Sequence, residues 1–241
     1  MSAPVIRTAG FDGFVVTFGE RLTDAANSAA LAFRSALEDA RPDGLLETST
    51  SLVSTYLRFD PLTTPHGEMK ARMETLLAGR DWLAAPLPPG RTLWRVPVAF
   101  GGAAGPQLAE AADLAGLSED AAIASLTEAR TRVLTIGFAP GMPYLGQLPA
   151  AWDIPRQTNL TAEVPLGGLC VAIRQLVLFP NATPTGWRHI GQTRLRLFRP
   201  EADAPFVLKP GDEVALEPVS PAALDAIGDD PGGGAIAEPL P

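Results

Sequence analysis

The first part of the chain alternates between apolar residues at strand spacing and at helix spacing. Residues 14–18 form a short apolar run typical of a strand, and residues 52–59 repeat that pattern with alternating apolar positions. Each run is followed by apolar residues three or four positions apart, as on one face of a helix: Ala26, Ala30, Phe33 and Leu37 after the first, and Met69, Met73, Leu76 and Leu77 after the second. This pattern predicts a compact α+β unit.

Residues 81–90, with the sequence DWLAAPLPPG, interrupt this periodicity with three prolines and a glycine. Proline and glycine without an apolar period are typical of a linker. We therefore predict a domain border there and assign residues 1–85 to an α+β N-terminal domain.

Short apolar runs separated by turn residues dominate the chain from residue 131 onward. They cover residues 132–136, 170–173, 176–179, 194–198 and 214–216, and two short alanine-rich helices are expected before them. Several short strands joined by turns are typical of a β-barrel or a β-sandwich. Residues 86–220 are therefore predicted to form a second, mainly β domain, and residues 221–241, rich in Ala, Gly, Pro and Asp, a flexible tail.

The net charge and the absence of long apolar runs bear on which partners the protein can bind and where in the cell it is expected. The net charge is −8 at pH 7 and the sequence pI is near 4.8, so the field around the protein would repel nucleic acids and anionic membranes. No uncharged apolar run approaches the roughly 18 residues of a membrane-spanning helix, and the N-terminus lacks the pattern of a signal peptide. We therefore expect a cytoplasmic protein without a nucleic-acid or membrane partner.

The single cysteine, Cys170, cannot form an internal disulfide, and the sequence has no paired Cys/His spacing typical of a zinc site. Its apolar neighbours favour a buried, inert thiol. We expect no metal-binding residues in this chain.

Glycines and prolines punctuate residues 137–146, directly after a predicted strand. Glycine lets backbone N–H groups approach a ligand and proline makes the turn rigid, so such a loop could hold an oxyanion or a carboxylate. The loop lacks the Gly-Lys-Ser/Thr ending of a P-loop, and no helix is expected after it. A purely structural turn is the alternative.

Three polar side chains nearby are candidates for chemistry. Arg156, behind a proline, could present a bidentate guanidinium to a carboxylate or phosphate, or form a surface salt bridge. Gln175 interrupts a largely apolar run, where an amide needs partners; it could orient a substrate or tie two loops together. His189 could transfer protons near neutral pH, although no Asp or Ser partner is evident and a structural role is the alternative.

Several motifs in order resemble the allophanate hydrolase subunit 1 family, which is also the family of the B-type subunit of 5-oxoprolinase. They are GFAPGMPYL at 137–145, Pro155-Arg156, Val164-Pro165-x-Gly167, Arg174-Gln175, and the run PTGWRHIG at 184–191. The family includes the sporulation-kinase inhibitor and is related to the carboxyltransferase domain of urea carboxylase. The likeness covers most of the chain, because Phe59-Asp60-Pro61 and Phe100-Gly101-Gly102 also resemble family positions.

The resemblance implies an α+β N-terminal domain followed by a cyclophilin-like β-barrel. It also implies a partner, the second subunit of the family complex (allophanate hydrolase subunit 2, or the C-type subunit of 5-oxoprolinase). The reaction implied is ATP-dependent cleavage of a small lactam or amide, chiefly the opening of 5-oxo-L-proline to L-glutamate. ATP with magnesium would be bound by the assembled complex, and this chain alone would be inactive.

The resemblance also directs attention to particular side chains. Gln175 and His189, singled out above by their side-chain chemistry, are the candidate catalytic residues. The implied substrate-binding residues are Gly137, Phe138, Pro140, Gly141, Tyr144, Arg156, Gly186 and Trp187.

Some positions depart from the family pattern. Gly168 stands where many relatives have serine, Ala103 where an acidic residue is common, and His189 where an apolar residue is common; Leu176, Val177 and Thr185 replace residues that are usually Thr, Gly and Gly. These departures leave an alternative open, a non-catalytic regulatory binding module resembling the sporulation-kinase inhibitor.

Overall fold

The computed structural model describes residues 3–240, and the chain divides into two compact units, Met1–Pro89 and Gly90–Pro241. The division falls inside the proline-rich stretch that the sequence indicates as a linker, four residues after the predicted border at 85. Across residues 3–240, none of the helices combines the length and the apolar composition that a membrane span requires.

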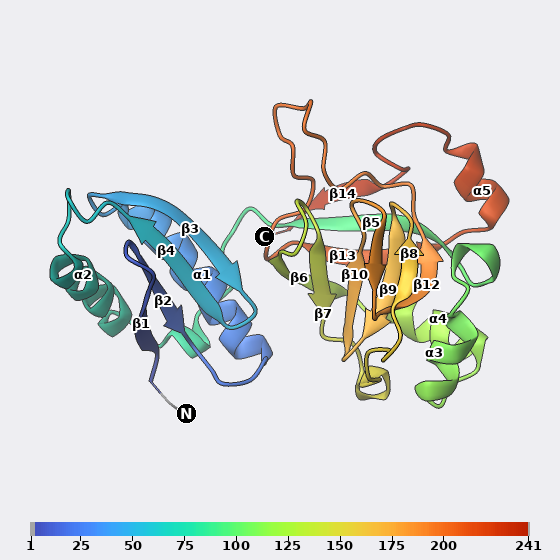
Figure 1. Ribbon diagram of the computed structural model, residues 1–241, viewed down its shortest axis with the longest axis horizontal. Coiled ribbons are helices and arrows are strands. Elements are labelled where there is room, and N and C mark those ends of the chain that lie inside the picture. The colour runs from blue at the N-terminus through green and yellow to red at the C-terminus, as the bar shows by residue number, and fades with distance from the viewer. Residues whose placement is uncertain (1–2, 241) are drawn as a thin grey trace. The chain divides into compact units, whose positions relative to one another are not determined.

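The first unit is a four-stranded antiparallel sheet with two helices, as the alternating periods predict (Figure 1). The strand order is β1-β2-β4-β3, with β1 (Val5–Ala9), β2 (Gly13–Thr17), β3 (Leu45–Ser51) and β4 (Ser54–Phe59). The helices are α1 (Asp24–Ala40) and α2 (His66–Ala78). Thr23 caps α1, because its hydroxyl accepts the N–H of Ala26 at 3.1 Å. Apolar residues of β2, β4 and both helices form one core: Phe14, Val16, Phe33, Leu37, Leu57, Phe59, Met69 and Met73.

The second unit is a closed β-barrel of seven strands. Their order is β12-β9-β10-β7-β6-β13-β5, and the end of β5 pairs with β12 to close the ring. The strands are β5 (Thr92–Phe100), β6 (Thr131–Ile136), β7 (Pro143–Gly146), β9 (Gly168–Ala172), β10 (Gln175–Leu178), β12 (Arg188–Gln192) and β13 (Glu213–Pro218). Only the β5–β13 pair among them is parallel. This confirms the predicted combination of a small α+β region and a β-barrel.

Side chains that alternate along the strands divide between two apolar clusters. Leu169, Val171, Leu176 and Leu178 belong to the main core, together with residues from α3 (Leu108–Leu114) and α4 (Glu119–Glu128). The intervening Cys170, Ala172 and Val177 belong to a second cluster with Met142, Val164, Phe179 and Trp187. Val164 ends β8 (Thr161–Val164), which forms a two-stranded ribbon with β11 (Thr183–Thr185) on this other face of the barrel wall.

The prediction of a flexible tail from residue 221 is wrong. These residues contain α5 (Pro221–Ala226), capped by Ser220, and β14 (Ile236–Pro239), which pairs antiparallel with the first half of β5. An ion pair between Arg95 and Glu238, 2.7 Å apart, joins the same two strands. Composition missed this segment because it is held by backbone hydrogen bonds to a strand more than 130 residues earlier in the chain, which no local pattern records.

The predicted strand at 194–198 is also wrong, because these residues do not form a strand in the described part of the chain. Leu195 and Leu197 are buried in the main core, which explains the apolar pattern. The backbone of this segment bonds instead to turns and loops: the N–H of Arg196 donates to the carbonyl of Pro231 at 3.1 Å, and Phe198 makes one isolated bridge to Phe206. The segment is therefore a buried connection rather than a strand.

Candidate functional site

The loop between β6 and β7 closes on itself as a tight turn. The N–H of Gly137 donates to the carbonyl of Met142, and the N–H of Met142 donates to the carbonyl of Ala139, both at 3.1 Å. Gly141 has φ +75°, and a Cβ there would lie 3.0 Å from the Leu197 carbonyl oxygen, so glycine is needed for the turn and for its close packing. These two amides are occupied within the loop, which leaves it less able to cradle an anion than its sequence suggests.

Phe138 is the prominent side chain of this turn. Its φ is +70°, unusual for a bulky residue, and its side chain is 77% exposed. Pro140 is also exposed. The turn therefore presents an aromatic ring to solvent, a few residues before the start of β7.

Four of the predicted substrate-binding residues lie together: Tyr144 on β7, Arg156 on the loop before β8, and Gly186 and Trp187 just before β12. The rings of Tyr144 and Trp187 meet edge to face with centroids 5.9 Å apart. Burial raises the pKa of Tyr144, and the charge of Arg156 acts in the opposite direction. A Cβ on Gly186 would be 3.6 Å from two guanidinium nitrogens of Arg156. The result is an exposed cation beside an aromatic pair.

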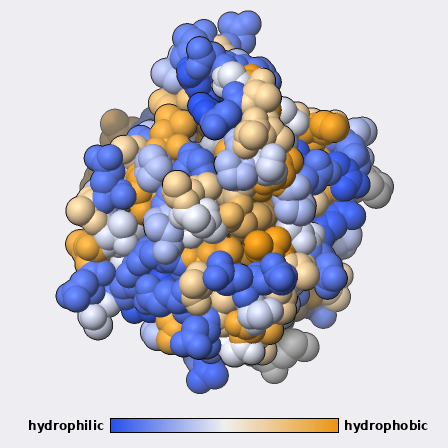
Figure 2. All heavy atoms as spheres, turned by 90° about the vertical axis from the view of Figure 1, so that its right-hand side faces the viewer, coloured by the Kyte–Doolittle hydropathy of each residue, from blue (hydrophilic) through white to orange (hydrophobic). Residues whose placement is uncertain are grey.

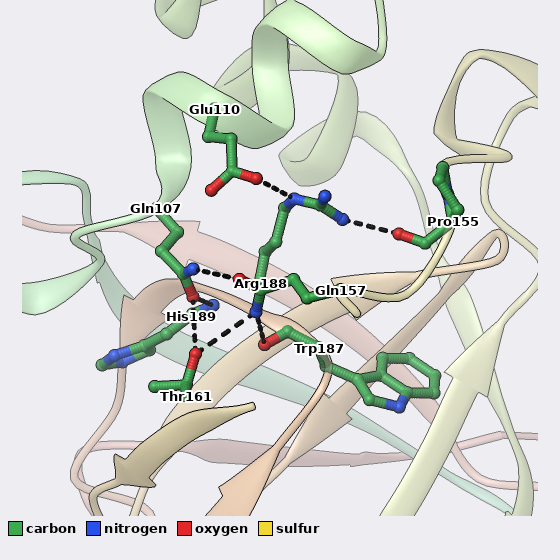
Figure 3. A network of polar contacts seen from close by, with 8 residues as sticks. All are labelled: Gln107, Glu110, Pro155, Gln157, Thr161, Trp187, Arg188 and His189. Atoms are coloured by element: carbon green, nitrogen blue, oxygen red, sulfur yellow. Dashed lines mark hydrogen bonds and ion pairs between the residues drawn. The ribbon is translucent and has the colours of Figure 1, made fainter. Parts of the chain in front are cut away.

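A buried arginine holds the loop that carries Arg156 (Figure 3). The side chain of Arg188 is 8% exposed; its Nε donates to Oε1 of Glu110 on α3 at 2.8 Å, and its Nη1 donates to the carbonyl of Pro155 at 2.6 Å. On the other side of Arg156, the backbone N–H of Gln157 donates to the carbonyl of Gly186 at 2.7 Å. The residues before and after Arg156 are thus fixed independently.

Two glutamines extend this network (Figure 3). Gln107 Nε2 donates to Oε1 of Gln157 at 2.7 Å, and Gln107 Oε1 accepts the N–H of His189 at 2.9 Å. Gln157 Nε2 donates to the carbonyl of Trp187 at 3.1 Å and to the hydroxyl of Thr161 at 3.2 Å. One cooperative set of hydrogen bonds therefore joins the start of α3, the Arg156 loop, β8 and β12.

We expect Arg188→Met to lower the free energy of unfolding by about 2 kcal/mol, because it removes two charge-assisted hydrogen bonds from a buried donor. Glu110 is half exposed and can return to water, which limits the loss. Urea unfolding of the full chain measures the effect. The control is Arg58→Met, which breaks only exposed ion pairs and should cost less than about 1 kcal/mol. Equal losses in the two variants would contradict a special role for Arg188.

His189 lies on the other side of this network, with its ring pointing away from the Trp187 indole (Figure 3). The residue is 5% exposed, and Nε2 has no hydrogen-bond partner within residues 3–240. A Cβ on Gly168 would lie 3.4 Å from that nitrogen, so the ring packs against the bare backbone of β9. Burial lowers the pKa of His189, which keeps the imidazole neutral at pH 7.

This shift predicts a pH dependence of stability. The unfolded His189 has a pKa of about 6.5 and the folded one a lower value, so between the two the unfolded state binds more protons. Stability that is present above about pH 6.5 should therefore be lost as the pH falls through the folded pKa. Urea unfolding at a series of pH values should show a shallower dependence in His189→Leu than in wild type. Identical slopes in His189→Leu and wild type would refute this origin.

Gln175 is buried on β10, opposite Gly146 on β7 and Ala172 on β9. Val177, two residues later, is opposite Tyr144, and side chains two apart share a face, so Gln175 and Tyr144 face the same side of the wall. Cys170 belongs to this face as well, and burial raises the pKa of its thiol, as the sequence suggested.

Sequence reasoning missed Gln107, Glu110, Gln157 and Arg188. Arg188 stands between Trp187 and His189 at the start of a buried strand, and a charge there is a signal that it must have partners. The two glutamines carry no such signal, because they are 50 residues apart in sequence and each is ordinary in its own loop. No group of three or more His, Cys, Asp or Glu side chains suited to a metal ion occurs in the described part of the chain.

Comparison with known proteins agrees with the resemblance read from the motifs. The chain is 29% identical over 225 residues to the B-type subunit of 5-oxoprolinase from Bacillus subtilis (strain 168), covering 89% of this chain and 92% of that protein. It is 41% identical over 132 residues to the B-type subunit of 5-oxoprolinase from Escherichia coli O157:H7, covering 55% of this chain and 61% of that protein.

Solved structures show the same relationship at the level of the fold. The crystal structure of TTHA0988 matches 90% of this chain with a TM-score of 0.73 and 30% identity, and this chain spans 40% of that longer chain. The Kluyveromyces lactis urea carboxylase matches 98% of this chain with a TM-score of 0.74 over 24% of its own length; at 16% identity it supports the fold alone.

The family model described as carboxyltransferase domain, subdomain C and D, matches residues 4–208, which span the first unit from residue 4, the second unit as far as residue 208, and all of the motifs noted above. The chain therefore belongs to this carboxyltransferase-domain family, whose members similar to it include the B-type subunits of 5-oxoprolinase.

Proposed function

We propose that the chain is one subunit of an ATP-dependent complex that cleaves a small lactam or amide, with 5-oxo-L-proline as the first candidate substrate. The observation that carries the proposal is the exposed Arg156 guanidinium beside the Tyr144–Trp187 pair, on a loop held by Arg188. Arginine binds carboxylates through two parallel hydrogen bonds, and aromatic side chains pack against a flat ring. 5-Oxo-L-proline offers both a carboxylate and a planar lactam. The relatives named as 5-oxoprolinase subunits support the choice.

In this proposal the chain's own residues bind and orient the substrate. Arg156 holds the carboxylate, the Tyr144–Trp187 pair contacts the ring, and Gln175, on the same face as Tyr144, hydrogen-bonds the lactam amide. The exposed ring of Phe138 and the glycines at 137, 141 and 186 shape the rim. Opening the ring adds one water across the C–N bond and yields a carboxylate and an amine. ATP would supply activation of the lactam, which is otherwise a poor electrophile.

His189 is the candidate proton acceptor, since its ring is neutral and Nε2 is free of partners within residues 3–240. Its burial means that the hairpin around Gly168 must shift before the ring can reach a substrate. We assign no ATP-binding or magnesium-binding step to this chain, because the site offers one cation and no cluster of acidic ligands in its described residues. The second subunit would complete that part of the site.

Co-expression with the second and third subunits, followed by purification through a tag on this chain, tests the proposal. The expected result is a stable complex that hydrolyses ATP only when 5-oxo-L-proline is added, while this chain alone is inactive. A stable complex without 5-oxoproline-dependent turnover would exclude that substrate.

The alternative is a regulatory binding module without catalysis. One observation favours it: Phe138 is a large ring held in the solvent by a strained turn, as expected of a side chain that docks into a partner. Failure of this chain to co-purify with either of the other two subunits would support this second function over the first.

A further inference from the structure

The second unit contains a cavity of about 430 Å³ that none of the predicted site residues lines. It lies where the end of β12 and the segment that follows it face α5 and the loop 228–230. Figure 2 views the unit from the side on which α5 lies in Figure 1, and hydrophobic residues near the middle of that face are interleaved with hydrophilic ones. The volume is in the range of small-molecule sites.

The cavity has an apolar wall formed by small and branched side chains: Ala99, Ala103, Ala104, Leu166 and Leu224. Its floor is ordered by hydrogen bonds. Gln192 Nε2 donates to the carbonyl of Leu166 at 2.6 Å, and the hydroxyl of Thr193, a buried residue, accepts the N–H of Leu195 at 3.2 Å. These bonds fix Gln192, at the end of β12, and the adjacent Thr193, so one side of the cavity is tied to the barrel.

Charges of both signs line the same space. Arg194 and Asp225 form an ion pair at 2.7 Å and so neutralise one another. The carboxylate of Asp230 accepts hydrogen bonds from the backbone N–H groups of Gly232 and Gly234, which lower its pKa. Its oxygens are therefore already engaged within the turn. Arg196 and Asp229 remain, and within residues 3–240 neither side chain makes a hydrogen bond or an ion pair. The cavity thus offers one free cation, one free anion and an apolar wall.

We propose that this cavity binds a small zwitterion, an α-amino acid, with its carboxylate on Arg196, its ammonium group on Asp229 and its side chain against Ala103, Ala104 and Leu224. A guanidinium and a carboxylate that line the same cavity match the two charges that every free α-amino acid carries. The cavity shares no lining residue with the proposed lactam site and is present in this chain alone.

Calorimetric titration of the full chain with L-leucine, L-glutamine and L-glutamate tests the proposal. At least one is expected to bind one to one with a Kd of about 1 mM or tighter. The N-acetyl derivative and the α-carboxamide of that amino acid should each bind at least tenfold more weakly, because each lacks one of the two charges. No saturable binding of any of the three amino acids, or equal binding of the N-acetyl derivative, would overturn the assignment.

Variants connect the binding to these side chains. Arg196→Gln and Asp229→Asn should each weaken binding at least tenfold, while Asp203→Asn, on an exposed loop outside the cavity lining, should leave it unchanged. Arg156→Ala should also leave it unchanged, so the result does not depend on the lactam site. Unaltered affinity in both Arg196→Gln and Asp229→Asn would refute the site.

Discussion

Replacing Arg156 by alanine is expected to lower the turnover of the assembled complex by up to about a hundredfold. The proposed substrate carboxylate would lose a charge-assisted, bidentate partner, and hydrogen bonds to charged groups contribute about 1.5–3 kcal/mol. A loss near the upper end of that range corresponds to about a hundredfold in rate. The fold should be unaffected, because Arg156 is exposed and the loop is held by its neighbours, through Pro155 and Gln157.

Steady-state assays of 5-oxoproline-dependent ATP hydrolysis would measure the effect, with co-purification of the partner subunits as the check on assembly. Arg156→Lys keeps the charge but loses the planar fork, so its activity should fall between wild type and Arg156→Ala. Arg7→Ala, an exposed arginine of the first unit, is the matched control and should behave like wild type. Unchanged turnover in Arg156→Ala would remove this residue from the mechanism.

The parts of the fold that the sequence predicts are those with local causes. The helix α1 follows from apolar residues at helical spacing behind a capping threonine, and the linker follows from three prolines within ten residues. Strand β14 has no such local signature, because it is held by pairing with β5, which is at the opposite end of the unit in sequence. Leu195 and Leu197 misled in the opposite direction: burial produced a strand-like pattern where the backbone bonds to loops.

The candidate site divides along the same line. Tyr144, Arg156 and Trp187 lie in motifs whose order in the chain can be recognised, and the structure brings them together. The contacts that hold the Arg156 loop cannot be recognised in the sequence. Arg188 holds this loop by binding the backbone carbonyl of Pro155, and it is itself paired with Glu110, 78 residues away. A carbonyl acceptor leaves no trace in a sequence. The proposed amino-acid cavity was hidden for a related reason, since one side of it comes from residues that composition assigns to a tail.

Replacing Gly105 by alanine is expected to destabilise the second unit by more than about 4 kcal/mol, the scale of the most severe single substitutions. A Cβ at this position would lie 2.0 Å from the carbonyl oxygen of Ile190 and 2.6 Å from the amide nitrogen of Gly191. Both atoms belong to the backbone of β12, which cannot yield as a flexible side chain could. The neighbouring Gly101 also donates its N–H to the Ile190 carbonyl at 3.2 Å, so moving the strand away would break a hydrogen bond at the point where the barrel closes.

Gly137→Ala provides the matched control, because a Cβ there meets no atom within 4 Å and its φ lies outside the left-handed region. It should unfold at the wild-type urea concentration or slightly above it, since alanine restricts the unfolded chain. Gly105→Ala should either give no soluble protein or unfold far below that concentration. If it is insoluble, the complementary variant Gly105→Ser should fail as well, whereas Gly102→Ala, where a Cβ has open space, should remain soluble with the modest cost of its positive φ. Wild-type stability of Gly105→Ala would show that the 102–107 segment and β12 do not pack as described. The hydrogen bond from the His189 N–H to Gln107 would then be contradicted as well.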